Sequence, residues 1–334
     1  MSNSKNASLT VLPPAGGTVP FGGALLAGHG ALAGDCPPAG HAAQKHYLTK
    51  PLRREVRLPD WFRVIPQTGP NYLEIRHTLK KLNLNTICED GRCPNRWECW
   101  NDRTATFMIL GEVCTRSCGF CAVTFGKPTA LDQEEPKRLA EAIAALGIEH
   151  AVITSVNRDD LDLGGAEIFA ETITKIKEKS PNCKVEILIP DFQGKREALE
   201  IVLSERPDVV AHNMETVPRL YRAVRPQAKY FRSLQVLSWI KEGRFLSKTG
   251  MMLGLGESED EVCCVMGDLV EIGCDILTLG QYLQPTDRHL PVVEFVHPDR
   301  FRALKEMGEA MGIRHIEAGP LVRSSYRAKA QIPS

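Results

Sequence analysis

Short apolar runs alternate with amphipathic stretches over most of the chain. Runs at 104–110, 151–156, 184–189, 209–212, 249–255 and 276–283 predict strands, with a late strand near 315–318. Between the runs, apolar residues recur at helical spacing, as they do at Leu139, Ile143 and Leu146. Strand–helix repetition of this kind predicts parallel strands joined by right-handed crossovers. About six such units fall short of the eight of a closed barrel, so the predicted fold is α/β, a partial (β/α)6 parallel barrel.

The two ends of the chain depart from this repeating pattern. Gly, Pro and Ala dominate residues 1–50, which predicts a flexible low-complexity extension. Residues 51–103 contain a helical pattern of apolar positions and then a loop rich in Gly, Pro and Asn, and they are too few to form a domain. We therefore expect an N-terminal flap over 51–103, the barrel over 104–312 and a C-terminal closing segment over 313–334.

Polar residues follow the predicted strands. Asn157 and Arg158 come after the second strand, and Asn213 and Glu215 come after the fourth. One such residue alone is as well explained by a helix cap or a turn. Their recurrence after several strands favours a functional site, because the carboxyl ends of parallel strands meet at one edge of a barrel.

Six of the eleven cysteines form two trios with different spacings. The trios are Cys88, Cys93 and Cys99, spaced C-x4-C-x5-C, and Cys114, Cys118 and Cys121, spaced C-x3-C-x2-C. Three thiolates on a short loop suit three irons of a cubic 4Fe–4S cluster and leave the fourth iron for another ligand. Disulfides suit small secreted chains better than one of 334 residues, and structural zinc prefers four closed ligands, commonly two C-x2-C pairs. The two incomplete trios therefore favour iron–sulfur clusters.

Charge and hydropathy disfavour two classes of partner. The 41 basic and 41 acidic residues balance, whereas nucleic-acid-binding proteins carry a basic excess or stripe, and no apolar run approaches the length of a membrane span. The first residues lack the compact apolar core of a secretory signal, and no arginine precedes Arg53, unlike a mitochondrial transit peptide. We expect a cytoplasmic protein, with an organelle matrix as the alternative if the extension is a targeting segment.

The second trio resembles the motif of the radical S-adenosylmethionine superfamily, which has this spacing and an aromatic residue before the last cysteine. Phe120 occupies that position. The resemblance implies a barrel of the radical S-adenosylmethionine type, in which Cys114, Cys118 and Cys121 bind a 4Fe–4S cluster whose open iron chelates S-adenosylmethionine. It also implies reductive cleavage of that cofactor to a 5′-deoxyadenosyl radical, which abstracts hydrogen from an unactivated carbon.

The first trio and the end of the chain resemble the lipoyl synthase family. Cys88, Cys93 and Cys99 precede the radical motif, and Arg323-Ser324-Ser325-Tyr326 lies near the C-terminus. The resemblance runs from about Trp61 to Tyr326. It implies that the first trio holds an auxiliary 4Fe–4S cluster, with Ser325 as its fourth ligand and as a catalytic residue. Alkoxide is a poorer partner for an iron–sulfur cluster than thiolate, so one iron is held loosely and can leave.

The same resemblance implies the reaction and the partners. Two sulfur atoms from the auxiliary cluster enter at carbons 6 and 8 of an octanoyl group on a lysine, giving the lipoyl group, and two S-adenosylmethionine molecules are used. The expected carriers are E2 lipoyl domains and the glycine-cleavage H protein. A ferredoxin or flavodoxin is expected as electron donor, together with a cluster-repair carrier, and neither nucleic acid nor membrane is expected.

Signature segments of the family indicate candidate cofactor contacts. Asn157, Arg158, Asn213 and Glu215 lie in such segments, and Gly164 and Gly165 leave room for the backbone to approach the methionine amino group. This chain has Leu163 where the family usually has an acid before the two glycines, which is a departure from the signature.

Two other functions are open at this point. A radical methylthiotransferase acting on tRNA or protein shares the two-cluster chemistry, but the tRNA enzyme is expected to carry a basic appended domain, and only about eight residues follow Tyr326. Outside the enzymes, the alternative is a zinc-binding interaction module. Metal analysis separates them, because zinc is colourless and iron with labile sulfide is brown.

Overall fold

The computed structural model describes residues 58–66 and 68–332, so the extension predicted over 1–50 lies outside the described residues. Within the described part, eight strands form one sheet in the order β1-β2-β5-β6-β7-β8-β9-β10. They are β1 (Asn85–Thr86), β2 (Thr106–Ile109), β5 (His150–Ser155), β6 (Lys184–Leu188), β7 (Val209–Ala211), β8 (Leu246–Leu253), β9 (Ile276–Gln281) and β10 (His315–Gly319). All neighbours pair in parallel except β1 and β2. The predicted partial parallel barrel is confirmed.

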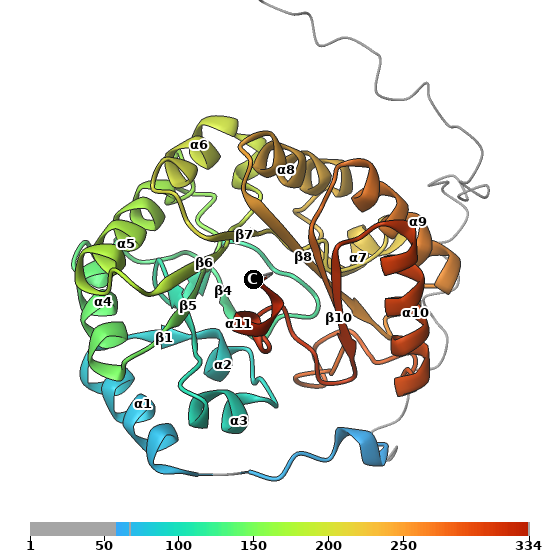
Figure 1. The fold of residues 1–334 in the computed structure, drawn as a ribbon, viewed down its shortest axis with the longest axis horizontal. Helices are drawn as coiled ribbons and strands as arrows, with labels where there is room; N and C mark the ends of the chain where they lie inside the picture. The colour runs from blue at the N-terminus through green and yellow to red at the C-terminus, as the bar shows by residue number, and fades with distance from the viewer. Residues whose placement is uncertain (1–57, 67, 333–334) are drawn as a thin grey trace, which may run out of the picture. The chain divides into compact units, whose positions relative to one another are not determined.

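The longer helices surround this sheet on its outer face (Figure 1). The longer ones are α1 (Pro70–Lys81), α4 (Glu135–Leu146), α5 (Ala166–Lys179), α6 (Arg196–Ser204), α8 (Tyr230–Glu242), α9 (Glu259–Glu271) and α10 (Pro298–Met311). The shorter ones are η2 (Asp60–Phe62), α2 (Ile87–Asp90), α3 (Arg96–Asn101), η3 (Phe192–Gly194), η4 (Pro218–Leu220), α7 (Tyr221–Val224) and α11 (Ala328–Gln331). A separate parallel pair, β3 (Val113–Cys114) and β4 (Thr124–Phe125), flanks the loop of the second cysteine trio.

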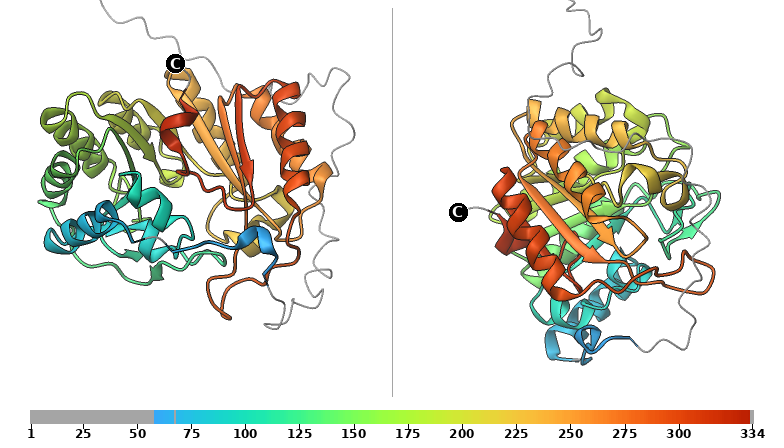
Figure 2. Two further views of the ribbon diagram at one scale, coloured as in Figure 1. Left: turned by 60° about the horizontal axis from the view of Figure 1, so that its bottom comes forward. Right: turned by 90° about the vertical axis from the view of Figure 1, so that its right-hand side faces the viewer.

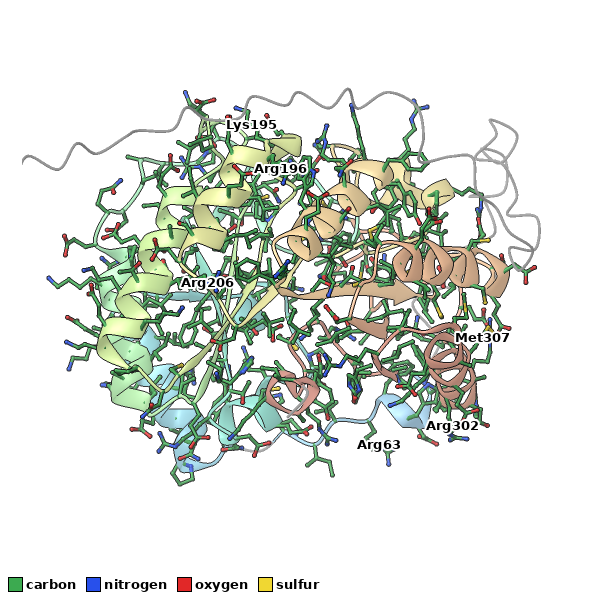
Figure 3. All side chains as sticks on the ribbon, turned by 45° about the horizontal axis from the view of Figure 1, so that its top comes forward. Arg63, Lys195, Arg196, Arg206, Arg302 and Met307 are labelled. Atoms are coloured by element: carbon green, nitrogen blue, oxygen red, sulfur yellow. The ribbon has the colours of Figure 1, made fainter. Side chains whose placement is uncertain are left out.

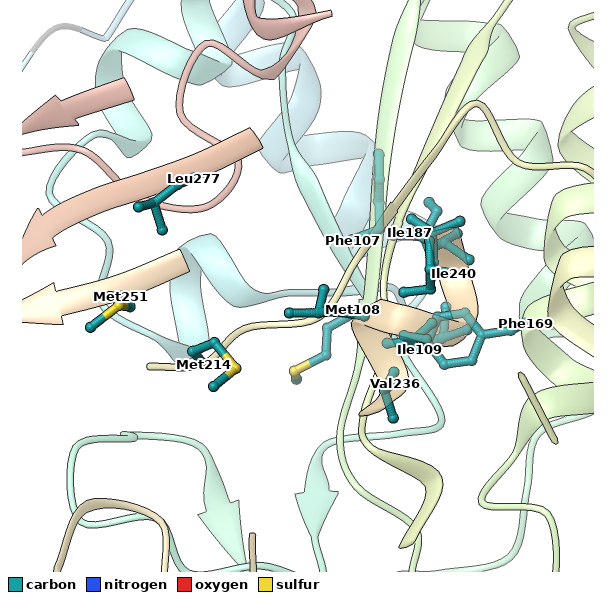
Figure 4. Packing of buried hydrophobic residues seen from close by; sticks show 14 of the residues in the cluster. Phe107, Met108, Ile109, Phe169, Ile187, Met214, Val236, Ile240, Met251 and Leu277 are labelled. Carbon is teal, nitrogen blue, oxygen red and sulfur yellow. The ribbon is translucent and has the colours of Figure 1, made fainter. Parts of the chain in front are cut away.

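Side chains of each strand alternate between the helix layer and the barrel interior. In β2, Phe107 and Ile109 are buried on the side of α5, where Phe169 lies, whereas Met108 points away from them and toward Met214 (Figure 4). The polar Thr106 is two residues before Met108 and therefore shares its face. One strand thus supplies apolar contacts to the core and a hydroxyl to the interior.

The sheet stays open on one side, and the end of the chain crosses the opening. Among the described strands, β10 pairs only with β9. After β10, the carbonyl of Pro320 accepts a hydrogen bond from Gln281 N (3.3 Å) at the end of β9, and α11 then contacts β5. Ala328 and Gln331 of α11 are buried. Figures 1 and 2 show this last helix within the ring of strands, so the closing segment is part of the core.

Two local structures differ from the sequence-based expectation. The first cysteine trio, expected on an irregular loop, is carried largely by two short helices, and α2 begins where the Thr86 hydroxyl accepts a hydrogen bond from Glu89 N (3.3 Å). In addition, β8 begins at Leu246 rather than near 249. Its early residues look polar, yet Lys248 is buried against Glu186 (2.7 Å), and this ion pair lets a lysine occupy the sheet interior.

Charged side chains gather on the outer helices. Figure 3 shows Arg196 and Arg206 on the outer side of the molecule, and the Arg196 guanidinium lies 5.7 Å from the centre of the Trp239 ring on α8. None of the described helices has both the length and the hydropathy needed to cross a bilayer.

Candidate functional site

The first cysteine trio and Ser325 line one pocket. Cys88 belongs to α2, Cys99 to α3 and Cys93 to the turn between them, while Ser325 comes from the closing segment. The pocket holds about 290 Å³ of space between the atoms, its solvent-filled mouth included. The structure therefore brings the Ser325 hydroxyl to three thiols that lie more than 200 residues earlier in the sequence. Ser325 is likewise 219 residues from Thr106, which lines the same pocket.

Several contacts hold the closing segment against the first cysteine trio. The side chain of Asn95, which is itself buried, donates a hydrogen bond to Leu321 O (2.6 Å). Tyr326 donates its phenolic proton to Glu98 (3.0 Å), and Thr106 Oγ1 lies 2.7 Å from Ser325 Oγ. The position of Ser325 thus depends on α3, on β2 and on the turn before α3.

Burial raises the pKa of two thiols of this pocket, those of Cys88 and Cys99. Desolvation and the neighbouring Cys93 raise the pKa of Cys88 to about 11, against partial offsets from hydrogen bonds to Thr106 and Trp100. Burial also raises the pKa of Cys99, and the nearby Cys93 and Cys88 add to this effect. A bound metal removes the thiol protons, so loading of the pocket is coupled to proton release.

The residues of the pocket fit an iron–sulfur cluster better than a single metal ion. In a cubic cluster each thiolate binds a different iron, so the thiolates surround a volume. A structural zinc ion prefers four nitrogen or sulfur ligands that converge on one point, whereas this pocket offers three thiols and a serine hydroxyl. Arg323 lines the pocket without a carboxylate partner among the described residues, and burial lowers its pKa while Cys93 opposes that effect. This guanidinium suits an anionic group.

The second cysteine trio lies at the carboxyl edge of the barrel. Cys114 ends β3, and its sulfur accepts hydrogen bonds from the backbone N–H groups of Arg116 (3.4 Å) and Asn157 (3.3 Å). Because Asn157 follows β5, this contact ties the cysteine loop to the end of a barrel strand. Burial raises the pKa of Cys118 to about 11 and that of Cys121 to about 12.

The cysteine loop is packed from the opposite side by the segment after β9. Gly119 has no room for a side chain, because a Cβ there would lie 2.9 Å from Leu290, and Leu290 N donates to Gly119 O (2.9 Å). His289 Nε2 lies 2.9 Å from Cys121 O. In the same segment, Pro285 O accepts a hydrogen bond from Arg92 (3.0 Å), which neighbours Cys93. One stretch of chain therefore contacts both cysteine trios.

A buried ion-pair network anchors the loop of the second trio to the barrel. Arg116 lies between Cys114 and Cys118, and its guanidinium binds Asp159 (2.6 Å) and Asp191 (2.6 Å). Asp191 is completely buried, and the hydrogen bond and charge of Arg116 outweigh desolvation and hold its pKa well below the ordinary value. The network connects the loop to the ends of β5 and β6.

Asn213, Glu215 and Ser324 form a polar group at the interior of the barrel. Asn213 Nδ2 donates to Glu215 (3.0 Å) and to Ser324 Oγ (2.8 Å), while Asn213 Oδ1 is buried without a partner in the described chain. Burial raises the pKa of Glu215, against the charge of Arg225 and the hydrogen bond from Asn213. A Cβ at Gly250 would approach Asn213 and Ser324 to 3.0 Å, so a glycine on β8 leaves space for this group.

Of the remaining predicted cofactor contacts, some line a pocket and others already have structural partners. Asn157, Arg158 and Gly164 line a small pocket past the ends of β5 and β6, and Asn157 Oδ1 is buried without a partner in the described chain. The Arg158 guanidinium, however, binds Asp160 (2.9 Å) and backbone carbonyls. Gly165 adopts a φ of +85° and abuts the Leu110 side chain, so its observed contacts explain a glycine structurally.

Among the residues that line the first pocket, Asn95, Thr106 and Arg323 were not assigned a role from the sequence. Thr106 has the residue type of an ordinary strand, and Arg323 stands out only as part of the Arg-Ser-Ser-Tyr motif. The available signal for Thr106 was a hydroxyl on the interior face of an otherwise apolar strand.

Comparison with protein families gives two matches. Residues 108–267 match the radical SAM superfamily, and residues 32–93 match the N-terminal domain of lipoyl synthase of the radical SAM family. A lipoyl synthase of Rubrobacter xylanophilus is 54% identical over 297 residues, which cover 88% of this chain and 92% of that protein. The chain belongs to the lipoyl synthase family. A mitochondrial lipoyl synthase of Nematostella vectensis is 52% identical over 275 residues, covering 82% of this chain and 94% of that protein.

Solved structures agree with the family assignment at the level of the fold. The [FeFe]-hydrogenase maturase HydG has a TM-score of 0.51 at 14% identity, covering 63% of this chain and 50% of that one. Methylornithine synthase has a TM-score of 0.50 at 16% identity, covering 63% of both chains. At such low identity these similarities concern the fold alone.

Proposed function

We propose that this chain acts as a lipoyl synthase: it inserts sulfur at carbons 6 and 8 of an octanoyl group on a lysine of a carrier protein. The observation that carries the proposal is the pocket lined jointly by Cys88, Cys93, Cys99 and Ser325. A sulfur donor needs ligands that hold a cluster yet let one iron leave, and three thiolates with one weak oxygen ligand meet that need. Identities of 54% and 52% to lipoyl synthases support the same activity.

The second trio is proposed to hold the radical-generating 4Fe–4S cluster with S-adenosylmethionine. When bound, these groups supply the 5′-deoxyadenosyl radical. The chain's own contribution is to orient the cofactor: the unpartnered Oδ1 atoms of Asn157 and Asn213 and the buried carboxylate of Glu215 are acceptors for an ammonium group. Gly164 is proposed to let the backbone approach. Roles for Arg158 and Gly165 toward the cofactor stay predictions.

The first trio is proposed to hold the auxiliary 4Fe–4S cluster that donates the sulfur. Cys88, Cys93 and Cys99 bind three irons, Ser325 binds the fourth, and Arg323 balances the negative charge. Ser324 contacts Asn213, and its neighbour Ser325 contacts Thr106. Two adjacent residues thus contact the polar group at Asn213 and the pocket of the first trio. This supports a single cavity, in which a carbon radical would form close to the sulfur that it receives.

Partners are proposed from family membership. Octanoylated E2 lipoyl domains and the H protein are the proposed carriers, a ferredoxin or flavodoxin is the proposed electron donor, and a cluster carrier is proposed to rebuild the consumed cluster. The predicted cytoplasmic or organellar location stays a prediction, since relatives include bacterial proteins and a mitochondrial one.

The test is anaerobic reconstitution with iron and sulfide, followed by mass spectrometry of an octanoylated carrier peptide. We expect a brown protein with about eight irons per chain, two 4Fe–4S clusters, and a peptide in which two hydrogens are replaced by two sulfurs. A colourless zinc protein would overturn the proposal in favour of a zinc-binding module. An iron protein that cleaves S-adenosylmethionine but leaves the peptide unchanged would overturn the lipoyl assignment.

Replacement of single cysteines separates the two trios. In Cys93→Ala we expect cleavage of S-adenosylmethionine to continue while the thiolated product disappears, because only the sulfur donor is damaged. In the matched variant Cys118→Ala both activities are expected to disappear. Loss of cleavage in Cys93→Ala, with the protein still folded, would mean that the two trios have been assigned in the wrong order.

A further inference from the structure

Among the described residues, Thr106 is the one whose side-chain hydroxyl contacts the Ser325 hydroxyl. The two oxygens are 2.7 Å apart and join the first long barrel strand to the closing segment, 219 residues later. Thr106 is 3% exposed, so water does not compete for this contact. The distance is typical of a good hydrogen bond between two hydroxyl groups.

Thr106 and Ser325 line the same pocket as the first cysteine trio. A threonine hydroxyl has one proton to donate and lone pairs to accept with, so it can donate a hydrogen bond to the Ser325 oxygen or accept one from it. The Thr106 hydroxyl can therefore pair with Ser325 in either protonation state.

The two states expected of Ser325 need opposite partners. A serine oxygen bound to iron has lost its proton and accepts hydrogen bonds, and a donor to such a charged oxygen forms a stronger bond than one between neutral groups. A released serine is a neutral alcohol and has a proton to donate. A buried hydroxyl left without a partner in either state would be costly.

On this basis, which rests on the function proposed above, we propose that Thr106 is the positioning residue for the exchangeable ligand Ser325. When the Ser325 oxygen is bound to iron, the Thr106 hydroxyl donates to it. When that oxygen is free and protonated, the Thr106 hydroxyl accepts a hydrogen bond from it. Ser325 thus keeps a partner on both sides of the exchange and stays in place for rebinding.

The proposal is tested by the lability of the auxiliary cluster in the absence of cofactor and substrate. The parent for this assay is Cys118→Ala, so that the auxiliary cluster alone is measured, and the readout is the rate at which a chelator removes the first iron anaerobically. We expect Thr106→Val to lose that iron roughly tenfold faster, the size expected for one lost hydrogen bond to a charged oxygen. Thr106→Ser keeps the hydroxyl and is expected to match the parent.

Thr154→Val is the matched control. Thr154 is a buried threonine on the adjacent strand β5, and its hydroxyl donates to Leu188 O (3.1 Å), away from the pocket. We expect the iron-release rate of the parent in this variant. If Thr106→Val releases iron at the same rate as Thr154→Val, the proposal is wrong. If Thr106→Val does not fold, Thr106→Ala is read by the same assay and the same criterion.

A double variant distinguishes action through Ser325 from a general effect on the pocket. In a Ser325→Ala background, Thr106→Val is expected to add nothing to the iron-release rate, because its partner is already gone. An equal acceleration in both backgrounds would show a structural effect and overturn the proposal. The cluster content of the unmodified protein is measured first: a protein without an auxiliary cluster overturns the proposed function, whereas a normal cluster that is insensitive to Thr106 overturns only this inference.

Discussion

Neighbouring side chains of the closing segment contact different parts of the candidate site. Ser324 receives a hydrogen bond from Asn213, whereas Ser325 lies against Thr106 and Arg323 lines the pocket of the first trio. A shift of this short stretch by one residue would exchange these contacts. Its fixed position, held by Tyr326 on Glu98, is therefore needed for both polar groups at once.

A buried histidine next to the site predicts a pH dependence of stability. His212 contacts Ile189 O (2.9 Å) and Ser233 Oγ (2.9 Å), and burial together with Arg225 lowers its pKa from 6.5 to about 4. The unfolded chain binds this proton first as the pH falls, so the free energy of unfolding decreases between pH 6.5 and about 4. The full loss is about 3 kcal/mol.

The measurement is the thermal unfolding midpoint across that pH window. The variant His212→Gln is expected to lose less stability on acidification than the unmodified protein, because its side chain cannot bind the proton. His77→Gln, which changes an exposed histidine of α1, is expected to follow the unmodified protein. Parallel curves for all three proteins would contradict the assignment of this pH dependence to His212.

At the scale of residues, functional side chains that recur at a recognisable interval in the sequence could be predicted, whereas isolated ones could not. The spacing of the cysteines predicts cluster ligands, whereas Ser325 could be predicted only from the Arg-Ser-Ser-Tyr motif. Thr106 has the residue type expected in any strand, and its significance comes from a partner 219 positions away. Asp191 likewise reads as a helix cap, yet it is completely buried against Arg116.

At the scale of elements, strand β9 and the closing segment meet backbone to backbone. A Cβ at Gly280 of β9 would overlap the carbonyl oxygen of Val322 and approach the Arg323 guanidinium (3.3 Å). We predict that Gly280→Ala pushes the segment away from the sheet and so displaces Ser325. Sulfur insertion is expected to fall strongly while cleavage of S-adenosylmethionine continues, as measured by the ratio of thiolated peptide to 5′-deoxyadenosine.

Gly267→Ala provides the matched control on helix α9. A Cβ there meets only Met311 at 3.9 Å, an ordinary contact, and alanine in place of glycine within a helix adds about 1 kcal/mol of stability. The product ratio should not change. An unchanged ratio in Gly280→Ala as well would mean that the close packing at Val322 does not fix the position of Ser325.

The regular elements were predictable because their apolar periodicity is sustained. The strands near 151–156, 184–189 and 276–283 and the helix now seen as α4 follow the expected pattern closely. The short helices α2 and α3 could not be predicted, since each spans only a turn or two among Gly, Pro and Asn. They are stabilised by tertiary contacts such as the stacking of Tyr72 on Trp97 (4.8 Å between ring centres).

At the scale of the whole molecule, the closing segment completes a sheet that does not close on itself. We predict that a chain ending at Gly319 loses the auxiliary cluster on purification and has a lower unfolding midpoint, because buried residues such as Ala328 and Gln331 are removed. Iron analysis and thermal unfolding measure both effects. Residual iron is expected near four per chain, the content of a single 4Fe–4S cluster.

A second truncation tests whether the effect belongs to that end of the chain. Removal of residues 1–31, which precede the stretch matched to the family at 32–93, is expected to leave iron content and the unfolding midpoint unchanged. Full iron content in the chain ending at Gly319 would contradict a role of the closing segment in retaining the auxiliary cluster.

The separation between the cysteine trio and its proposed serine partner sets an order of assembly. Cys88, Cys93 and Cys99 lie within one short stretch, whereas the 219-residue contact at Ser325 forms only after the intervening barrel has folded, since distant contacts carry the larger loop-closure cost. The thiols are therefore together while the open side of the sheet still gives access to them. We expect a maturation window in which a delivery protein can insert the inorganic core, and docking of the chain's last turn ends it.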